Sequence, residues 1–236
     1  MNLIVKRPVI VGRVITVLLF LLHQSAHAGR PMEIDDAGIV DQGTCQLEAW
    51  ADIRQHSEGY WLMPACNIGG NLELSLGGGF QHEKHADHGK TISVQAKTVV
   101  IEGLAEYLDV AVSVGYDFHR IDGDAEREWT LNVPVTMALG SEHLLWHNNI
   151  GTVFEQEDEH WLLTWGAGLE YAATERVSLY AEIFGESGTR PFYQLATGYW
   201  WFPEQLQVTF GFADSLEGSR DERWLTLGLN WVGWSF

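Results

Sequence analysis

Apolar and polar residues alternate along much of the chain after residue 43. Every odd-numbered residue is apolar from Leu131 to Leu139 and again from Trp161 to Tyr171, while most residues between them are small or polar. A period of two places successive side chains on opposite faces of a β-strand. The pattern therefore predicts an all-β chain whose strands have one apolar face and one small or polar face.

The alternation predicts twelve strands. They are expected at residues 44–54, 60–67, 71–82, 91–101, 107–119, 129–139, 143–155, 160–171, 177–185, 191–201, 206–214 and 224–236. Most of them reach the length of about 9–11 residues that a tilted strand needs to cross a bilayer. Twelve is an even number, as in bacterial single-chain barrels. We therefore predict a single antiparallel transmembrane β-barrel with up-and-down topology over residues 44–236.

The predicted connections fall into two alternating classes. Those at 68–70, 140–142, 172–176 and 202–205 are mostly tight, whereas those at 83–90, 120–128, 156–159 and 215–223 are longer or more charged. Short periplasmic turns and longer outer loops alternate in this way in outer-membrane barrels. The alternation places both ends of the barrel domain on the periplasmic side.

The last predicted strand ends in aromatic residues, as is typical of outer-membrane barrels. We expect Trp234 and Phe236 to form the signal that the barrel-assembly machinery reads after periplasmic chaperones deliver the chain. The apolar residues from Leu225 to Trp231 share one parity, while Trp234 and Phe236 have the other. A bulge near Val232 and Gly233 would reconcile the two parities.

The first 28 residues have the three regions of a secretory signal peptide. These are a basic region (Lys6, Arg7, Arg13), an unbroken apolar run (Val14–Leu22) and an Ala26-His27-Ala28 cleavage site. The apolar run is too short for a membrane-spanning helix, so a retained anchor is the alternative. We predict a signal peptide at 1–28, a periplasmic N-terminal segment at 29–43 and location in the outer membrane of a Gram-negative bacterium.

Charge and composition agree with this class. The formal net charge is −18, and the three basic residues of the predicted signal peptide are part of that balance. Such acidity argues against nucleic acid as a partner, because phosphates are bound by Lys and Arg. Mean hydropathy is −0.08 although the chain has 11 Trp, which fits a barrel with aromatic residues at the two membrane interfaces and outer-membrane lipid as a partner. A soluble β-sandwich with a Trp-rich core is the alternative.

Cys45 and Cys66 are the two cysteines of a chain predicted to enter an oxidising compartment. Their midpoint lies in the first predicted loop, so in an antiparallel hairpin they would face each other across the two strands. There is no Cys-x-x-Cys motif for redox catalysis. We predict a structural disulfide near the periplasmic rim, with two free thiols as the alternative.

Candidate chemistry is sparse. His82, His85 and His88 follow a His-x-x-His-x-x-His spacing that could bind Zn²⁺ or Cu²⁺, although a solvated polar loop has the same composition. Neither His143 nor His147 is followed two residues later by a serine, so the His-x-Ser signature of the outer-membrane phospholipase is absent. We assign no catalytic residue and expect no cofactor and no enzymatic activity.

Side chains on the polar parity are expected to face the lumen. They include Glu48, Asp52, Arg54, Glu73, Gln95, Lys97, Asp109, Asp117, His119, Asn132, His147, Asn149, Glu170, Glu182, Gln207 and Asn230. Acidic residues outnumber Arg54 and Lys97, which predicts a hydrated, acidic interior because buried charges need water or each other. Inward glycines such as Gly166 and Gly168 indicate either free space or strand curvature.

The stretch from Arg30 to Gly38, followed by Gly43-Thr44-Cys45-Gln46-Leu47-Glu48 and later Asn71-Leu72-Glu73-Leu74, resembles a family of outer-membrane transporters linked to the meta-pathway of phenol degradation. Ile34 stands where the family usually has Thr. The resemblance implies uptake of small organic or aromatic compounds. We predict a barrel that passes or binds a small-molecule solute, with a non-conducting binding or structural barrel and an outer-membrane hydrolase as the alternatives.

Overall fold

The computed structural model describes residues 32–83, 88–104, 107–121, 124–141, 143–217 and 222–235. The predicted signal peptide, His85 and Phe236 lie outside these residues. None of the described residues belongs to a helix long and apolar enough to cross a membrane.

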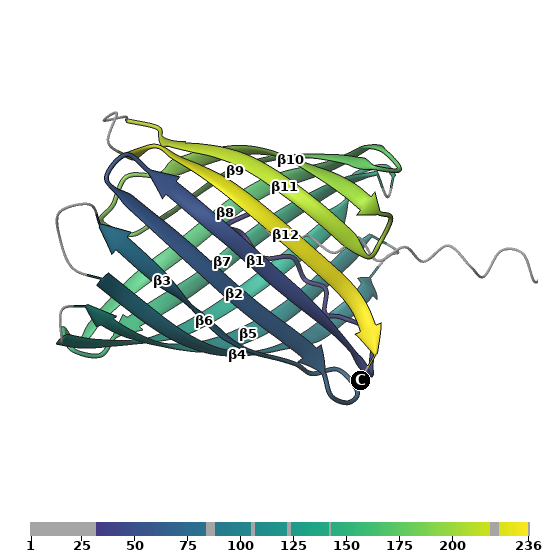
Figure 1. Cartoon of the computed structure of the whole chain (residues 1–236). Helices are drawn as coiled ribbons and strands as arrows, with labels where there is room; N and C mark the ends of the chain where they lie inside the picture. Colours follow the sequence, from purple (N-terminus) through teal and green to yellow (C-terminus); the bar gives the residue numbers. More distant parts are fainter. Residues whose placement is uncertain are drawn as a thin grey trace, which may run out of the picture.

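Twelve antiparallel strands form one closed barrel, as predicted, and each strand pairs with its neighbours in sequence (Figure 1). The strands are β1 Thr44–Arg54, β2 Ser57–Asn67, β3 Glu73–Glu83, β4 His88–Leu104, β5 Leu108–Ile121, β6 Asp124–Ala138, β7 Leu144–Glu155, β8 His160–Thr174, β9 Val177–Glu186, β10 Phe192–Phe202, β11 Leu206–Ser215 and β12 Trp224–Ser235. Pairing of β1 with β12 closes the ring, so each described strand has a neighbour on both sides and none is an open edge.

The predicted bulge lies at Gly233. Cys45 pairs with Trp234, whereas the next residue, Gln46, pairs with Val232, so Gly233 is the extra residue of β12. Gly233 has a φ of +80°, a conformation that glycine adopts without steric cost. The bulge explains why the apolar parity of β12 changes near its end.

The barrel has two distinct ends. The terminal end contains the start of β1, the end of β12 and the turns that follow even-numbered strands; the loop end contains the connections that follow odd-numbered strands. Connection length does not separate the two ends, because 55–56 at the loop end is as short as 175–176 at the terminal end.

The expectation of long loops at 83–90 and 120–128 is wrong. β3 extends to Glu83 and β4 begins at His88, while β5 extends to Ile121 and β6 begins at Asp124. The charged side chains at these strand ends, such as Glu83, Arg120 and Asp124, are exposed, so they do not prevent strand pairing. The ladder continues with His82 opposite His88 and Arg120 opposite Ala125.

The barrel is apolar outside and polar inside. Many large apolar side chains on the outer face are strongly exposed, among them Leu76, Phe80 and Trp161. Buried positions include Gln194, Gln207, Thr209 and Asn230. A soluble sandwich would bury its apolar face, so the alternative of a Trp-rich soluble core is wrong. The distribution is the one expected of a barrel in an apolar solvent.

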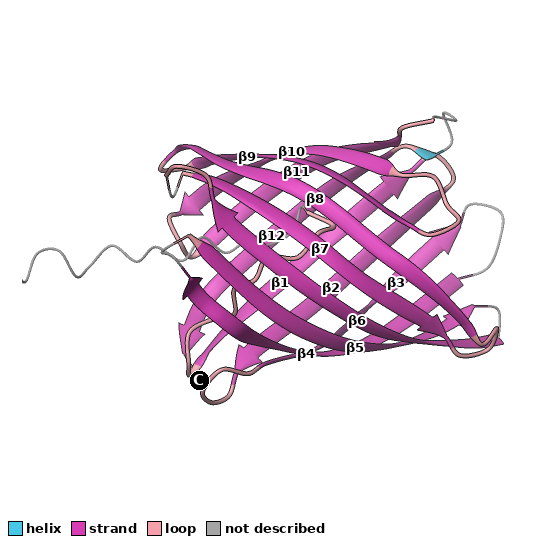
Figure 2. Ribbon diagram, turned by 180° about the vertical axis from the view of Figure 1, so that it is seen from behind, coloured by secondary structure: helices cyan, strands magenta, loops and turns pink. Residues whose placement is uncertain are grey.

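The described part of the N-terminal segment, from Met32, runs inside the barrel before β1 begins at Thr44 (Figure 1). Figure 2 shows the same loop from behind, within the ring of strands. Met32, Ile34, Asp36, Ala37 and Val40 are all buried. We expected a periplasmic segment at 29–43; its residues 32–40 instead occupy the lumen, because they are held there by polar groups of the barrel wall.

Candidate functional site

Residues 32–40, which we call the inner segment, cross the lumen and bond to both sides of it. At one side the backbone N–H of Val40 donates to Glu73 Oε2 (2.9 Å), and Asn67 Nδ2 donates to the Val40 carbonyl (2.9 Å). At the other side the N–H groups of Glu33 and Ile34 donate to the Glu182 carboxylate. These bonds satisfy backbone groups that would otherwise be buried without partners.

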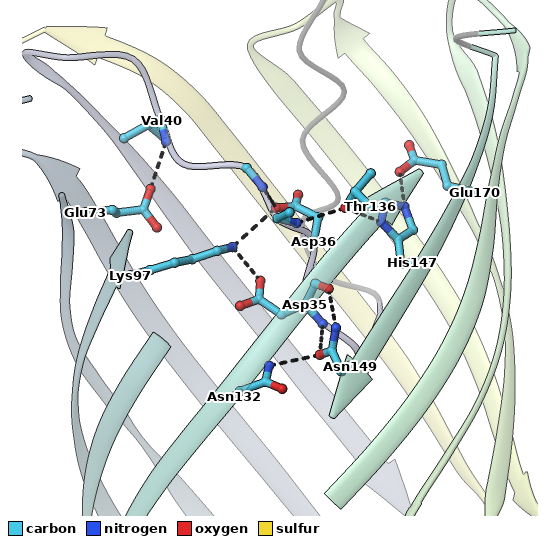
Figure 3. Close-up of polar contacts among 12 residues, drawn as sticks. Asp35, Asp36, Val40, Glu73, Lys97, Asn132, Thr136, His147, Asn149 and Glu170 are labelled. Atoms are coloured by element: carbon cyan, nitrogen blue, oxygen red, sulfur yellow. Dashed lines mark hydrogen bonds and ion pairs between the residues drawn. The ribbon is translucent and has the colours of Figure 1, made fainter. Parts of the chain in front are cut away.

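The middle of the inner segment bonds to β6 and β7 (Figure 3). Asn149 makes a two-way contact with Asp35: its Oδ1 accepts the Asp35 N–H at 2.8 Å, and its Nδ2 donates to the Asp35 carbonyl at 2.7 Å. Asn132 Nδ2 donates to the same Asn149 Oδ1 at 3.0 Å. An amide held from both sides in this way fixes the height of the segment in the barrel.

Lys97 on β4 supplies the charge that holds the inner segment. Its Nζ lies 2.8 Å from Asp35 Oδ1 and 3.3 Å from Asp36 Oδ1, and its side chain is only 6% exposed. Glu73, the cross-strand partner of Lys97 on β3, is also buried. A charge buried to this degree persists only with close opposite charges and hydrogen bonds.

Two inward glycines of β8 make room for the apolar side of the inner segment. A Cβ at Gly166 would collide with Ile34, and one at Gly168 would collide with both Ile34 and Met32. Met32 and Ile34 also pack against Tyr180, with Phe184 and Ala196 beside them. The space left by these glycines is therefore filled by the chain's own N-terminal residues.

A buried polar chain lies beside Ala37. The Ala37 N–H donates to Thr136 Oγ1 at 2.9 Å, so the Thr136 hydroxyl can donate to His147 Nδ1, 3.0 Å away. His147 Nε2 lies 3.5 Å from Glu170 Oε2, and His147 is fully buried (Figure 3). The order Thr–His–Glu has the form of a nucleophile, base and orienting acid. Here it holds the segment, because the hydroxyl oxygen is already occupied by Ala37.

A cavity of about 710 Å³ lies against the inner segment and is lined by strands β1 to β9. Its wall carries side chains predicted to face the lumen: Glu48, Asp52, Arg54, Glu73, Gln95, Lys97, Asp117, His119, Asn132 and Asn149. On the other side, between β9 and β12, Tyr180, Gln194, Gln207 and Asn230 are buried. The lumen is thus part cavity and part packed side chains.

Several cavity-lining charges have partners. Asp52 accepts hydrogen bonds from Trp50 Nε1 (3.2 Å) and Thr226 Oγ1 (2.7 Å). The Arg54 guanidinium lies over the ring of Trp224, with its Cζ 4.1 Å from the centroid. Asp117 accepts a hydrogen bond from Ser93. The polar lining is therefore held in place by the wall itself.

The structure separates the predicted lumen residues into three groups. Glu48, Asp52, Arg54 and Asp117 line the cavity, and Glu73 and Lys97 line it where they meet the inner segment. His147, Glu170 and Glu182 are buried beneath or beside the segment. Asp109 is placed differently: it accepts the N–H of Gly103 at an exposed position near the terminal end. Asp109 therefore stabilises a turn.

The sequence reasoning missed Asp35, Asp36 and Thr136. The available signal was an acidic pair close to the start of the barrel, together with the single lysine on the inward parity of the strands. Trp50 and Trp61 were also missed; they stack across β1 and β2 with centroids 5.7 Å apart. A Cβ at Gly79 would collide with Trp61.

Of the three predicted metal ligands, two are described and lie together. The His82 and His88 rings stack at 4.6 Å, with their Nδ1 atoms 2.8 Å apart. His85 lies outside the described residues. No group of three or more His, Cys, Asp or Glu side chains suited to a metal occurs in the described part of the chain.

Cys45 and Cys66 form a disulfide, as predicted. They are direct cross-strand partners on β1 and β2. The bond lies at the terminal end, next to Gly43, whose N–H donates to the Asn67 carbonyl. It therefore joins the hairpin at the point where the inner segment leaves the lumen.

The fold resembles solved outer-membrane barrels. The KdgM porin has a TM-score of 0.59 at 10% identity, covering 79% of this chain and 98% of that one. The COG4313 outer membrane channel from Pseudomonas putida F1 has a TM-score of 0.58 at 11% identity, covering 84% and 98%. The NanC porin has a TM-score of 0.55 at 8% identity, covering 81% and 100%. At these identities the likeness shows the fold alone.

No curated protein matches the chain. The model of one protein family, described as "Uncharacterised conserved protein UCP029691", matches residues 16–232, which is most of the chain. The chain therefore belongs to the family described as uncharacterised conserved protein UCP029691.

Proposed function

We propose that this protein is a β-barrel of the Gram-negative outer membrane that passes small polar solutes, with the inner segment limiting the size of the opening. Its exterior has the apolar surface that a bilayer requires, and its interior is polar. The predicted signal peptide supports export. The likeness to porins and an outer-membrane channel supports the same class.

The observation that carries the proposal is the cavity of about 710 Å³ beside the inner segment. Its size is in the range of small-molecule sites, and its wall is polar, unlike that of an apolar ligand pocket. A solute in the cavity would contact carboxylates, amides and hydroxyls and would remain hydrated. We infer that small hydrophilic solutes are the class that passes.

The charge of the cavity favours cations. Its described lining includes the carboxylates Glu48, Asp52, Asp117 and Glu128. The Lys and Arg residues of the same lining are Lys97, which is paired with Asp35 and Asp36, and Arg54. Fixed carboxylates in a narrow polar lumen raise the local concentration of cations. One similar solved structure is the KdgM porin in complex with disordered oligogalacturonate; for this protein we propose a cationic or neutral solute instead.

The resemblance of residues 30–48 to transporters linked to phenol degradation supports organic or aromatic solutes as a finer assignment. The polar cavity favours those that carry a positive charge or several hydroxyl groups. We also propose an orientation in the membrane, in which the terminal end of the barrel faces the periplasm and the loop end faces the outside of the cell.

A non-conducting binding or structural barrel is the second candidate. It is favoured by the inner segment itself, which has buried ion pairs and hydrogen bonds on six strands. A hydrolase is less well supported, because Thr136 and His147 lie behind Ala37 rather than facing the cavity.

Conductance separates the candidates. The mature chain and a variant lacking residues 32–40 would be refolded, checked for heat-modifiable mobility, and recorded in planar bilayers. We expect a small single-channel conductance for the full mature chain and a conductance several-fold larger for the deletion variant. A correctly folded deletion variant that does not conduct would contradict the proposal and favour the binding barrel.

A further inference from the structure

Cationic side chains on the outer face of the barrel gather in one place. Among the described strands, three Lys or Arg side chains have outward parity: Lys90 on β4, Arg120 on β5 and Arg127 on β6. All three lie on consecutive strands near the loop end. In a chain with 14 basic and 32 acidic residues, such a grouping on the outer face indicates a specific partner.

Lys90 and Arg120 are direct cross-strand partners, and both are exposed. Like charges opposite each other on one face of a sheet are destabilising. Within the described residues, no carboxylate lies at ion-pair distance from either of them. An external anion would remove the repulsion and bind both side chains at once.

Arg127 differs from the other two. Its N–H donates to Glu157 Oε2, and its guanidinium Nη1 donates to Glu157 Oε1, both at 2.7 Å. These bonds, the backbone one first, hold the pKa of Glu157 below its ordinary value. Arg127 is therefore paired with a carboxylate of the connection between β7 and β8, and Lys90 and Arg120 are the pair that needs an outside partner.

The same sector has an apolar belt directly below the charges. Lys90 Nζ lies 6.0 Å from the centroid of the Phe80 ring, and Ile92 and Trp129 are strongly exposed on the same outer face. Long basic side chains commonly lie along apolar surface and place the charge at the level of lipid headgroups. The pair is thus positioned where acyl chains end and headgroups begin.

We propose that Lys90 and Arg120 form a binding site for the phosphate of a lipid headgroup in the leaflet at the loop end. The proposal depends on the membrane location given under Proposed function, but not on conductance. Arg offers a planar fork that suits phosphate, and Lys adds a compact charge. A lipid fits better than a free anion, because its chains cover the belt and the net charge of −18 repels anions from solution.

The test uses the full mature chain in detergent with diphosphoryl lipid A, followed by native mass spectrometry. We expect the wild type to retain lipid A and the double variant Lys90→Gln/Arg120→Gln to bind it about tenfold more weakly. The charge-matched control is the double variant Arg176→Gln/Arg190→Gln, in which Arg190 lies at the loop end near Glu217 and Glu222 and Arg176 at the terminal end. It should bind as the wild type does.

Three results would overturn the proposal. Equal binding of dephosphorylated lipid A would show that the apolar belt alone is responsible. Complete competition by millimolar inorganic phosphate would show a free-anion site. Unchanged binding by the double variant would place the lipid elsewhere. Because binding is measured without ion flow, and the double variant should conduct as the wild type does, failure here is distinct from failure of the channel proposal.

Discussion

At the scale of single residues, carboxylates surround the ammonium group of Lys97. Asp35 and Asp36 contact it, and Glu73 is its cross-strand neighbour. The inner segment bends through this point, so its two acidic residues reach a cation that the barrel wall provides. In the described strands, the other inward cation is Arg54, which lies over Trp224 instead.

Replacing Lys97 with Met should loosen the inner segment. The change leaves buried carboxylates without their cation, and removing one partner of a buried ion pair costs about 3–5 kcal/mol. We expect faster hydrogen exchange of the amides of residues 32–40 and a larger single-channel conductance, while the barrel still folds.

The matched control is Arg127→Gln, which breaks an exposed ion pair with Glu157. Its N–O distance is 2.7 Å, close to the 2.8 Å between Lys97 and Asp35. Exposed pairs contribute no more than about 1 kcal/mol, so exchange of the inner segment should not change. Equal exchange of residues 32–40 in wild type and Lys97→Met would show that Lys97 does not hold the segment.

Gly166 tests the apolar side of the same contact. In Gly166→Val the new side chain would occupy the position of Ile34, so the segment must leave that part of the wall. We expect a larger single-channel conductance than that of the wild type, and the same heat-modifiable mobility in gel electrophoresis. Gly69→Ala is the control, since a Cβ there meets nothing within 4 Å. Identical conductance in all three proteins would contradict the packing described here.

At the scale of elements, the β1–β2 hairpin is held by its ladder and by the Cys45–Cys66 disulfide. The two cysteines are 21 residues apart in sequence. Closing a loop of that size lowers the entropy of the unfolded chain, which stabilises the folded state by about 3 kcal/mol in the chain-entropy model. The pairing is local, because both residues belong to one hairpin.

The free energy of unfolding of Cys45→Ser/Cys66→Ser should therefore be lower than that of the wild type by an amount near that estimate, so the variant should unfold at a lower urea concentration. Intact-mass measurement after alkylation, with and without reductant, establishes the bond first. Two alkylated thiols in the non-reduced wild type would show that no bond forms, and an unchanged midpoint would show that the bond adds no stability.

At the scale of the whole molecule, the closed ring makes the lumen a separate compartment with its own charge. The described lining of the cavity has more carboxylates than cations. Reversal potentials in a KCl gradient should therefore indicate a preference for K⁺ over Cl⁻, and added salt should weaken it, since charges are screened over about 8–10 Å near physiological ionic strength. A preference for Cl⁻ would contradict the proposed role of the acidic lining.

The sequence by itself determined the strands and the face on which most side chains lie. Alternation is a local property, because each residue of a strand points opposite to the one before it. It predicted twelve strands, the inward direction of Lys97 and Glu182, and a bulge near Val232 and Gly233. The symmetric spacing of Cys45 and Cys66 about a turn predicted their pairing for the same reason.

Only the tertiary structure decided what fills the lumen. The inner segment has no periodic pattern, and its contacts join residues far apart in sequence, such as Glu33 and Glu182, 149 positions apart. Parity gave the direction of Gly166 and Gly168 but not the presence of Ile34 and Met32 against them. The interior of a closed barrel is shared by all its strands, so its occupancy depends on how the whole ring is assembled.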